Sequence, residues 1–131
     1  MKSLSKTDGI IMSKIVDCLS GGSHFKLSRN KTYMALSIEN IGHYHGYADA
    51  ISLTHYGEQN GDLMRDPEMI FVLENGVYCP VYFRNDYAGV EQDVFVYDEA
   101  GKIRGIKLKL QSELAFFANT WMGNIKDQQE L

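Results

Sequence analysis

The chain has 131 residues, of which 44% are hydrophobic and 23% are charged, a composition typical of one globular domain and atypical of a disordered chain. No apolar run reaches the roughly 18 residues of a membrane helix, and the N-terminal MKSLSKTDGIIMSK lacks the apolar core of a secretion signal. Cys18 and Cys79 are far apart, so we expect free thiols in a reducing compartment. These features predict a single domain over residues 1–131, located in the cytoplasm.

The formal net charge of −4 conceals an uneven distribution. Residues 39–99 contain twelve acids and two bases, whereas the rest of the chain contains eleven bases and five acids. Because a nucleic acid is bound through clustered Lys and Arg, we expect no direct nucleic-acid binding by the middle segment. An acidic face formed by this segment suits a protein partner.

In the first half of the chain, the spacing of the apolar residues changes from that of a helix to that of a strand. Apolar residues recur at helical spacing between Leu4 and Leu19, and Gly21-Gly22 is a stop signal, which together predict a helix over 3–20. Residues 21–31 are predicted to be a polar connection. From Thr32 the period becomes two, which predicts a strand over 32–39, a turn over 40–46 and a strand over 47–56.

In the second half of the chain, residues typical of tight turns separate the predicted strands. Asn75-Gly76 supplies the positive φ angles of a type I′ turn and predicts a hairpin over 68–83, in which Pro80 indicates an edge or a bulge. Further strands are predicted for QDVFVYD (92–98) and KIRGIKLKL (102–110), with a turn at 98–101 and a bulge at Gly105.

The C-terminal segment is predicted to be a helix beginning at Gln111 or Ser112. Leu114, Phe117, Trp121 and Ile125 form one apolar stripe, so Trp121 and Phe117 are expected to face the sheet. The order of elements implies an α+β fold, with an antiparallel meander of about five to six strands and both helices packed on one face.

Two polar segments contain the candidate functional residues. The first, predicted to be a connection after the strand that ends near His55, contributes His55, Glu58, Asn60, Asp62, Arg65 and Asp66. Its carboxylates and histidine could serve acid–base chemistry in a hydrolase, or they could simply form a turn, since Asn60-Gly61-Asp62 has the composition of one. We expect Asp62 to accept backbone N–H groups and to hold this segment in shape. The second segment contributes Arg84, Asn85, Asp86 and Tyr87.

Instead of acid–base chemistry, the histidines could take part in a metal site. His43 and His45 are two residues apart and would point to one side of an extended segment. With His55 and the nearby carboxylates they could bind a divalent metal, but a pair of this spacing is more typical of a surface loop with partly stacked histidines, so we expect no metal. No phosphate-binding glycine loop, nucleophile elbow, CxxC pair or dinucleotide fingerprint is present, and we expect no cofactor.

Three segments resemble an uncharacterised bacterial family, a domain of unknown function from Firmicutes often encoded near phage and conjugative-element genes. They are HYGEQNGDLMRDPEM (55–69), YFRNDYAGVEQDVFVYD (82–98) and FANTWMGNIKDQQ (117–129). The resemblance covers roughly residues 45–129 and implies a cytoplasmic accessory role for mobile DNA. It implies no activity, substrate or catalytic residue.

The sequence therefore favours a small non-enzymatic module that binds a protein partner through an acidic face, a role that eight tyrosines suit. A nucleic-acid mimic is a sharper form of this hypothesis. A homodimer through a sheet edge or the Trp121 helix and a hydrolase that uses residues 55–66 are the alternatives. No membrane partner is expected.

Overall fold

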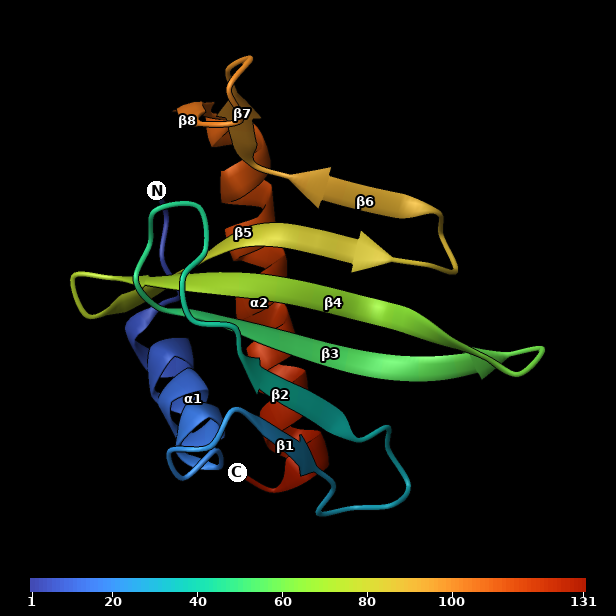
Figure 1. Cartoon of the computed structure of the whole chain (residues 1–131). Helices are drawn as coiled ribbons and strands as arrows, with labels where there is room; N and C mark the ends of the chain where they lie inside the picture. The colour runs from blue at the N-terminus through green and yellow to red at the C-terminus, as the bar shows by residue number, and fades with distance from the viewer.

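A computed structural model describes residues 1–131. Six strands form one antiparallel sheet in sequence order, and β7 and β8 form a separate two-stranded sheet (Figure 1). The predicted α+β fold with a meander sheet is confirmed. The elements are α1 (Lys6–Asp17), β1 (His24–Leu27), β2 (Leu36–Asn40), β3 (Ala50–Gln59), β4 (Asp62–Glu74), β5 (Val77–Asn85), β6 (Val90–Asp93), β7 (Phe95–Tyr97), β8 (Ile103–Ile106) and α2 (Leu108–Gln129).

Both helices differ from their predicted limits. The N-cap of α1 is Ser5, whose Oγ accepts a hydrogen bond from the N–H of Asp8 at 3.1 Å. Helix α2 begins at Leu108, so the prediction of a strand through residue 110 is wrong. The alternation of Lys and Leu in KLKL fits a strand, but Leu110 and Leu114 are also four residues apart and can lie on one helical face.

Among the first four strands, the sequence analysis missed β1 and placed the ends of β3 and β4 too far from each other. Strand β1 lies within the predicted polar connection of residues 21–31. The predicted connection of residues 57–66 is also wrong, because β3 and β4 continue through it as one hairpin that turns at Asn60-Gly61. Both turn residues have positive φ, 54° and 85°, and the far end of this hairpin projects beyond the other strands (Figure 1).

The hairpin at Asn75-Gly76 is confirmed, with Glu74 paired to Val77 across the turn. A register shift between Ile70 and Phe71 places an irregularity beside Pro80, as its missing N–H predicts. The second polar segment, which begins at Arg84, lies partly within a strand, since β5 runs to Asn85 and β6 begins at Val90.

The segment QDVFVYD does not form one strand of the main sheet. It is divided at Val94 between β6 and β7, and β7 pairs with β8 instead. A register shift between Val96 and Tyr97 lies opposite residues 103–105, in agreement with the bulge predicted at Gly105.

The core lies between one face of the sheet and the two helices. Leu53, Met69 and Phe71 are fully buried there, as are Met122 and Ile125 of α2. Trp121 is 5% exposed and packs edge-to-face on His55, whereas Phe117 is 39% exposed and contacts Phe83. The predicted orientation of the stripe on α2 is confirmed.

Cys18 and Cys79 are free, and Cys79 is buried. Neither helix combines the length and apolar character that crossing a membrane requires.

Candidate functional site

The sheet face that points away from the helices has no helix over it. Alternation along the strands places its side chains in rows that run across β2 to β6. We call this surface the open face, and its members include Ser37, Ser52, Thr54, Glu68, Tyr82, Arg84 and Glu91. The connection between β2 and β3 crosses the end of this face near β7 (Figure 1).

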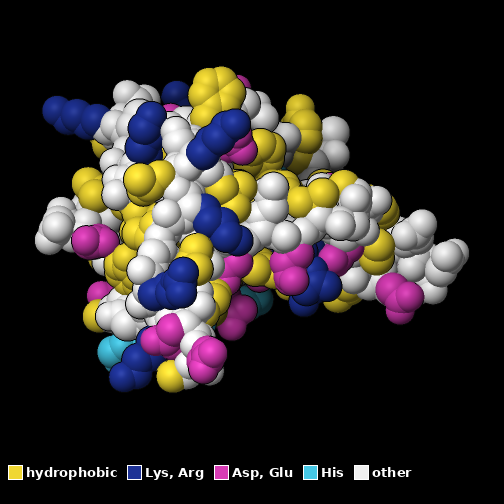
Figure 2. Space-filling view, turned by 90° about the horizontal axis from the view of Figure 1, so that it is seen from above, with side chains coloured by type: hydrophobic (Ala, Val, Ile, Leu, Met, Phe, Trp, Pro, Cys, Tyr) yellow, Lys and Arg dark blue, Asp and Glu magenta, His cyan; other side chains and the backbone are white.

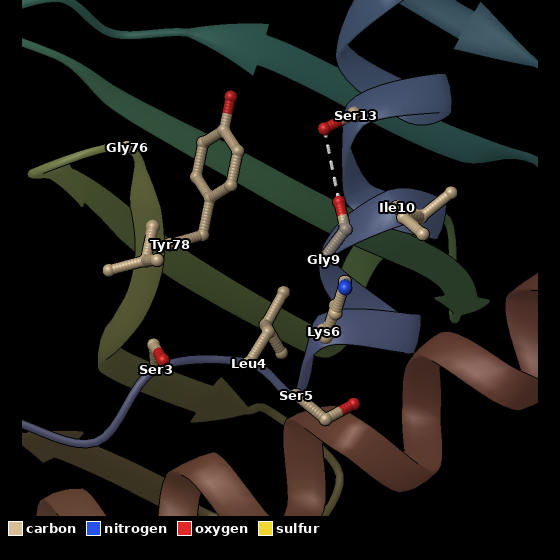
Figure 3. A pocket seen from close by; sticks show the side chains of 10 residues that line it. Ser3, Leu4, Ser5, Lys6, Gly9, Ile10, Ser13, Gly76 and Tyr78 are labelled. Atoms are coloured by element: carbon tan, nitrogen blue, oxygen red, sulfur yellow. Dashed lines mark hydrogen bonds between the residues drawn. The ribbon is translucent and has the colours of Figure 1, made fainter.

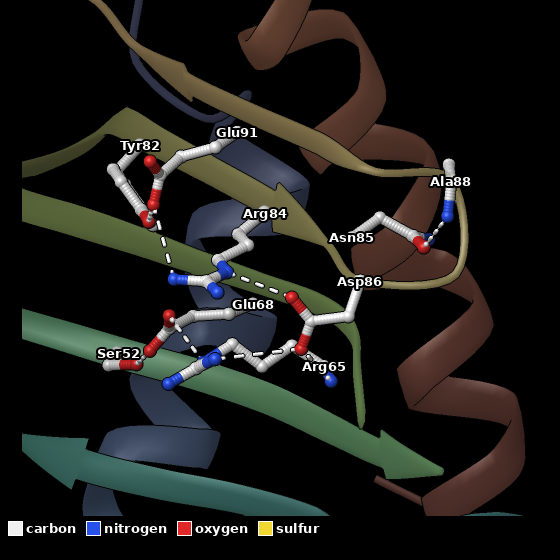
Figure 4. A network of polar contacts seen from close by, with 9 residues as sticks. All are labelled: Ser52, Arg65, Glu68, Tyr82, Arg84, Asn85, Asp86, Ala88 and Glu91. Carbon is white, nitrogen blue, oxygen red and sulfur yellow. Dashed lines mark hydrogen bonds and ion pairs between the residues drawn. The ribbon is translucent and has the colours of Figure 1, made fainter. Parts of the chain in front are cut away.

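Asp86 is the centre of a polar network on the open face (Figure 4). Its carboxylate accepts the backbone N–H of Arg65 at 2.8 Å and the Nε–H of Arg84 at 2.9 Å, and a guanidinium nitrogen of Arg65 is 3.5 Å away. The bonds from Arg65 and Arg84 hold the pKa of this carboxyl below its usual value. Asp86 therefore joins the β5–β6 turn to β4.

The network continues across the sheet in both directions. Arg65 pairs with Glu68 at 3.4 Å, and Glu68 accepts the hydroxyl hydrogen bond of Ser52 at 2.9 Å. On the other side Arg84 donates to Glu91 at 3.2 Å, and the Tyr82 hydroxyl donates to the same carboxylate. Burial, followed by the bond to Glu91, raises the pKa of Tyr82 to about 12.

Tyrosines border this network towards β7. The hydroxyl of Tyr97 donates to Asp93 at 2.6 Å. Tyr44, from the connection that crosses the face, has its pKa raised to about 12 by burial and then by the charge of Asp93. The open face thus combines carboxylates, two arginines and tyrosine hydroxyls whose protons stay bound at neutral pH.

The projecting part of the β3–β4 hairpin, residues 56–65, we call the arm. Glu58, Asn60 and Asp62 lie there, all exposed. The side chain of Asp62 makes no hydrogen bond, so the prediction that it holds the segment in shape is wrong; Asp86 holds the base of the arm through Arg65 instead. Tyr56 and Leu63 are 40% and 70% exposed.

A recess lies where the arm leaves the sheet. Its volume is about 350 Å³, and it is lined by Lys26, Ala35, Ser37, Tyr56 and Leu63. The apolar parts of the recess therefore adjoin the polar network on the same face.

His55 does not belong to this site. It lies on the helix side of β3, is 5% exposed, and its Nε2 has no hydrogen-bond partner. Burial lowers its pKa, although Asp66 acts in the opposite direction. Asp62 pairs with Gln59, four residues along β3 from His55, which is roughly 13 Å of strand. The structure therefore does not bring His55 and Asp62 together as an acid–base pair.

The remaining predicted residues support the arm. Asp66 accepts a hydrogen bond from the Asn85 amide at 3.0 Å, and Asn85 in turn accepts from the N–H of Ala88. Tyr87 lies directly over Gly57, where an added Cβ would collide with the ring hydroxyl. The β5–β6 turn thus contacts the arm at several points.

The histidines form no metal centre with the carboxylates. No group of three or more His, Cys, Asp or Glu side chains is arranged to hold a metal ion. His45 instead contacts the rings of Tyr44 and Tyr97, with centroids 4.5 and 5.1 Å apart.

Arginines lie among the acidic residues of the middle segment, since Arg65 pairs with Glu68 and Asp86 while Arg84 pairs with Asp86 and Glu91. Figure 2 shows Lys and Arg side chains between the carboxylates on the surface seen from above. The arm is an exception, because Glu58 and Asp62 are its only charged residues before Arg65.

A separate groove of about 370 Å³ lies between the N-terminal segment, α1 and the β4–β5 turn (Figure 3). It is lined by Leu4, Ile10 and Tyr78 among others, and contains none of the predicted site residues. Ser13 donates within α1 to the Gly9 carbonyl at 3.1 Å.

Sequence reasoning missed Glu68 and Glu91 as partners of the arginines, and Ser52 and Tyr82 as the donors to these two carboxylates. The alternation of side chains along each strand was visible in the sequence. Aligning these residues in rows across the sheet also requires knowing which strands are neighbours. Tyr56 and Leu63 were also missed, because both lie within a mostly polar segment.

The fold and the site define a small α+β domain with an uncovered sheet face that carries an ion-pair network. The chain belongs to the family described as domain of unknown function DUF6908, whose model matches residues 8–131. No match was found among the curated proteins or the solved structures.

Proposed function

We propose that this chain is a non-enzymatic protein-binding module whose interface is the open face together with the arm. The observation that carries the proposal is that exposed Tyr56 and Leu63 adjoin an ordered network around Asp86 on a face that no helix covers. An apolar centre beside a polar rim is the usual anatomy of a protein interface.

The arginines of the network are suited to this role. Arg65 and Arg84 are each held by carboxylates, and their side chains remain 36% and 38% exposed. Because their rotamers are already restricted, a partner that contacts them would lose less conformational entropy on binding. Arginine and tyrosine are also the residue types that most often dominate binding energy.

The same geometry favours binding over hydrolysis. A hydrolase of residues 55–66 needs His55 beside a carboxylate and open to substrate. His55 is instead buried against Trp121 on the opposite side of the sheet from Glu68. No observation favours the hydrolase, so we do not propose it.

The setting of the interaction forms part of the proposal. We place the protein in the cytoplasm, which two free cysteines suit. An accessory role for a mobile element rests on the resemblance of residues 55–69, 82–98 and 117–129 to the bacterial family. The alternative is a homodimer through a sheet edge or through the helix that contains Trp121.

Affinity capture with matched surface variants tests the proposal. Leu63→Ser removes an apolar side chain that is 70% exposed on the arm, and Phe116→Ser removes one that is 78% exposed on α2. The chain and both variants are used as bait in lysate from the host. A protein retained by the wild type and by Phe116→Ser but lost with Leu63→Ser supports the proposal, whereas equal retention by all three contradicts it.

A further inference from the structure

Part of β3 lies at a free sheet edge. Strand β2 pairs with β3 no further than the pair Leu36–His55, so residues 56–59 have a strand neighbour only on the β4 side. Exposed edges of this kind are templates for the addition of another strand.

Backbone alternation shows which groups point to this edge. The N–H of Ile41 donates to the carbonyl of Ala50, so Ala50 directs its backbone towards the β2 side. Every second residue of a strand does the same, which places the N–H and C=O groups of Tyr56 and Glu58 on the free edge. The β4 edge of the arm differs, because Asp86 exchanges hydrogen bonds with Arg65 there.

Side chains beside the edge indicate what an added strand would carry. The recess of about 350 Å³ opens beside it and is lined by apolar Tyr56, Leu63 and Ala35, with Ser37 and Lys26 on its β1–β2 side. Glu58 follows two residues after Tyr56 and points to the same face. Between Tyr56 and Met64 the chain has two acids and no base, so charge complementarity favours a basic strand.

We propose, building on the protein-binding function, that an extended segment of a partner protein adds to β3 at Tyr56 and Glu58, in line with β2. One apolar side chain of the segment occupies the recess, and a Lys or Arg two residues away pairs with Glu58. The occupant is therefore a basic, alternating strand and not a folded surface.

At Glu58, the contribution of the backbone N–H to peptide binding can be separated from that of the side chain. Glu58→Pro removes the edge-facing N–H, and proline is tolerated on the outer side of an edge strand. Glu58→Ala is the matched control, since it removes the same carboxylate and keeps the N–H. Thermal melts of both variants verify that the arm is retained.

A displayed library of random linear peptides is selected against the wild-type chain, and the enriched peptides are titrated against both variants. We expect enriched sequences to alternate apolar and basic residues. Glu58→Ala is expected to bind them about threefold more weakly, and Glu58→Pro about tenfold more weakly than Glu58→Ala. The amides of Tyr56 and Glu58 should become protected from hydrogen exchange on binding, while that of Leu63 should not.

Three results would overturn the inference: no enriched peptide, equal binding by Glu58→Pro and Glu58→Ala, or a dimer in light scattering that Glu58→Pro abolishes. The last result would assign the edge to a second copy of the chain. Failure here leaves the capture experiment with Leu63→Ser and Phe116→Ser intact, so failure of this inference can be distinguished from failure of the proposed function.

Discussion

Three aromatic residues of α2 provide a graded test of how the helix packs. Trp121 is 5% exposed and touches His55 and Phe117, Phe117 is 39% exposed, and Phe116 is 78% exposed. Truncating a buried aromatic to Ala costs about 3–5 kcal/mol, whereas exposed positions change stability by less than about 0.5 kcal/mol. We therefore expect Trp121→Ala to cost about 3–5 kcal/mol and Phe117→Ala about 1–2 kcal/mol, with Phe116→Ala close to zero.

These costs are large against the total free energy of unfolding, which is about 5–15 kcal/mol for a domain. At about 3–5 °C per kcal/mol for a chain of this size, Trp121→Ala should lower Tm by about 9–25 °C. Urea titrations should show the same order in their midpoints without a change in slope. A loss for Phe116→Ala equal to that for Trp121→Ala would refute the orientation of α2.

Three further outcomes are expected. Because burial lowers the pKa of His55 in the folded state, the unfolded state binds the proton more readily, so stability should fall as the pH falls through about 6.5; urea midpoints at pH 7.5 and 5.5 should differ less for His55→Leu than for the wild type. Asp86→Ala should lower Tm clearly more than Asp62→Ala, since only Asp86 accepts hydrogen bonds; equal shifts would contradict the role of the network. Gly76→Ala should destabilise the fold by about 1 kcal/mol because Gly76 has a φ of 79°. Gly9→Ala within α1 should instead stabilise it by up to about 1 kcal/mol. Thermal melts in which both variants shift Tm in the same direction would count against the assigned turn.

The parts of the fold that the sequence predicted correctly have strong local causes. Asn75-Gly76 lies between apolar strands and specifies its turn through positive φ. The stripe from Leu114 to Ile125 has one helical period and one buried side. In both segments local conformation and burial favour the same structure, so pattern alone sufficed.

The arm shows why the rest could not be predicted in the same way. Asn60-Gly61 carries the same turn signal as Asn75-Gly76, but its flanking residues are mostly polar because the arm projects from the core. Without a buried face a strand has no apolar alternation to detect. Strand β1 was missed for a similar reason, since three of its four residues are exposed.

The sequence predicted several residues of the candidate site correctly, but it did not predict which of them lie together. Arg65, Arg84 and Asp86 do meet, because β4 and β5 are neighbours. His55 and Asp62 do not, because alternation turns His55 towards α2 and the arm carries Asp62 away from it. The predicted strand ended at residue 56, whereas β3 continues to Gln59, so the separation of His55 from Asp62 along the arm could not be predicted.

Hydrogen-exchange mass spectrometry of the chain with its captured partner tests the central claim most directly. If the open face and arm form the interface, peptides covering residues 56–65 and 82–91 should gain protection, while those covering the exposed side of α2 around Phe116 should not change. Protection confined to α2 or to the groove beside α1, with the arm unaffected, would contradict the account.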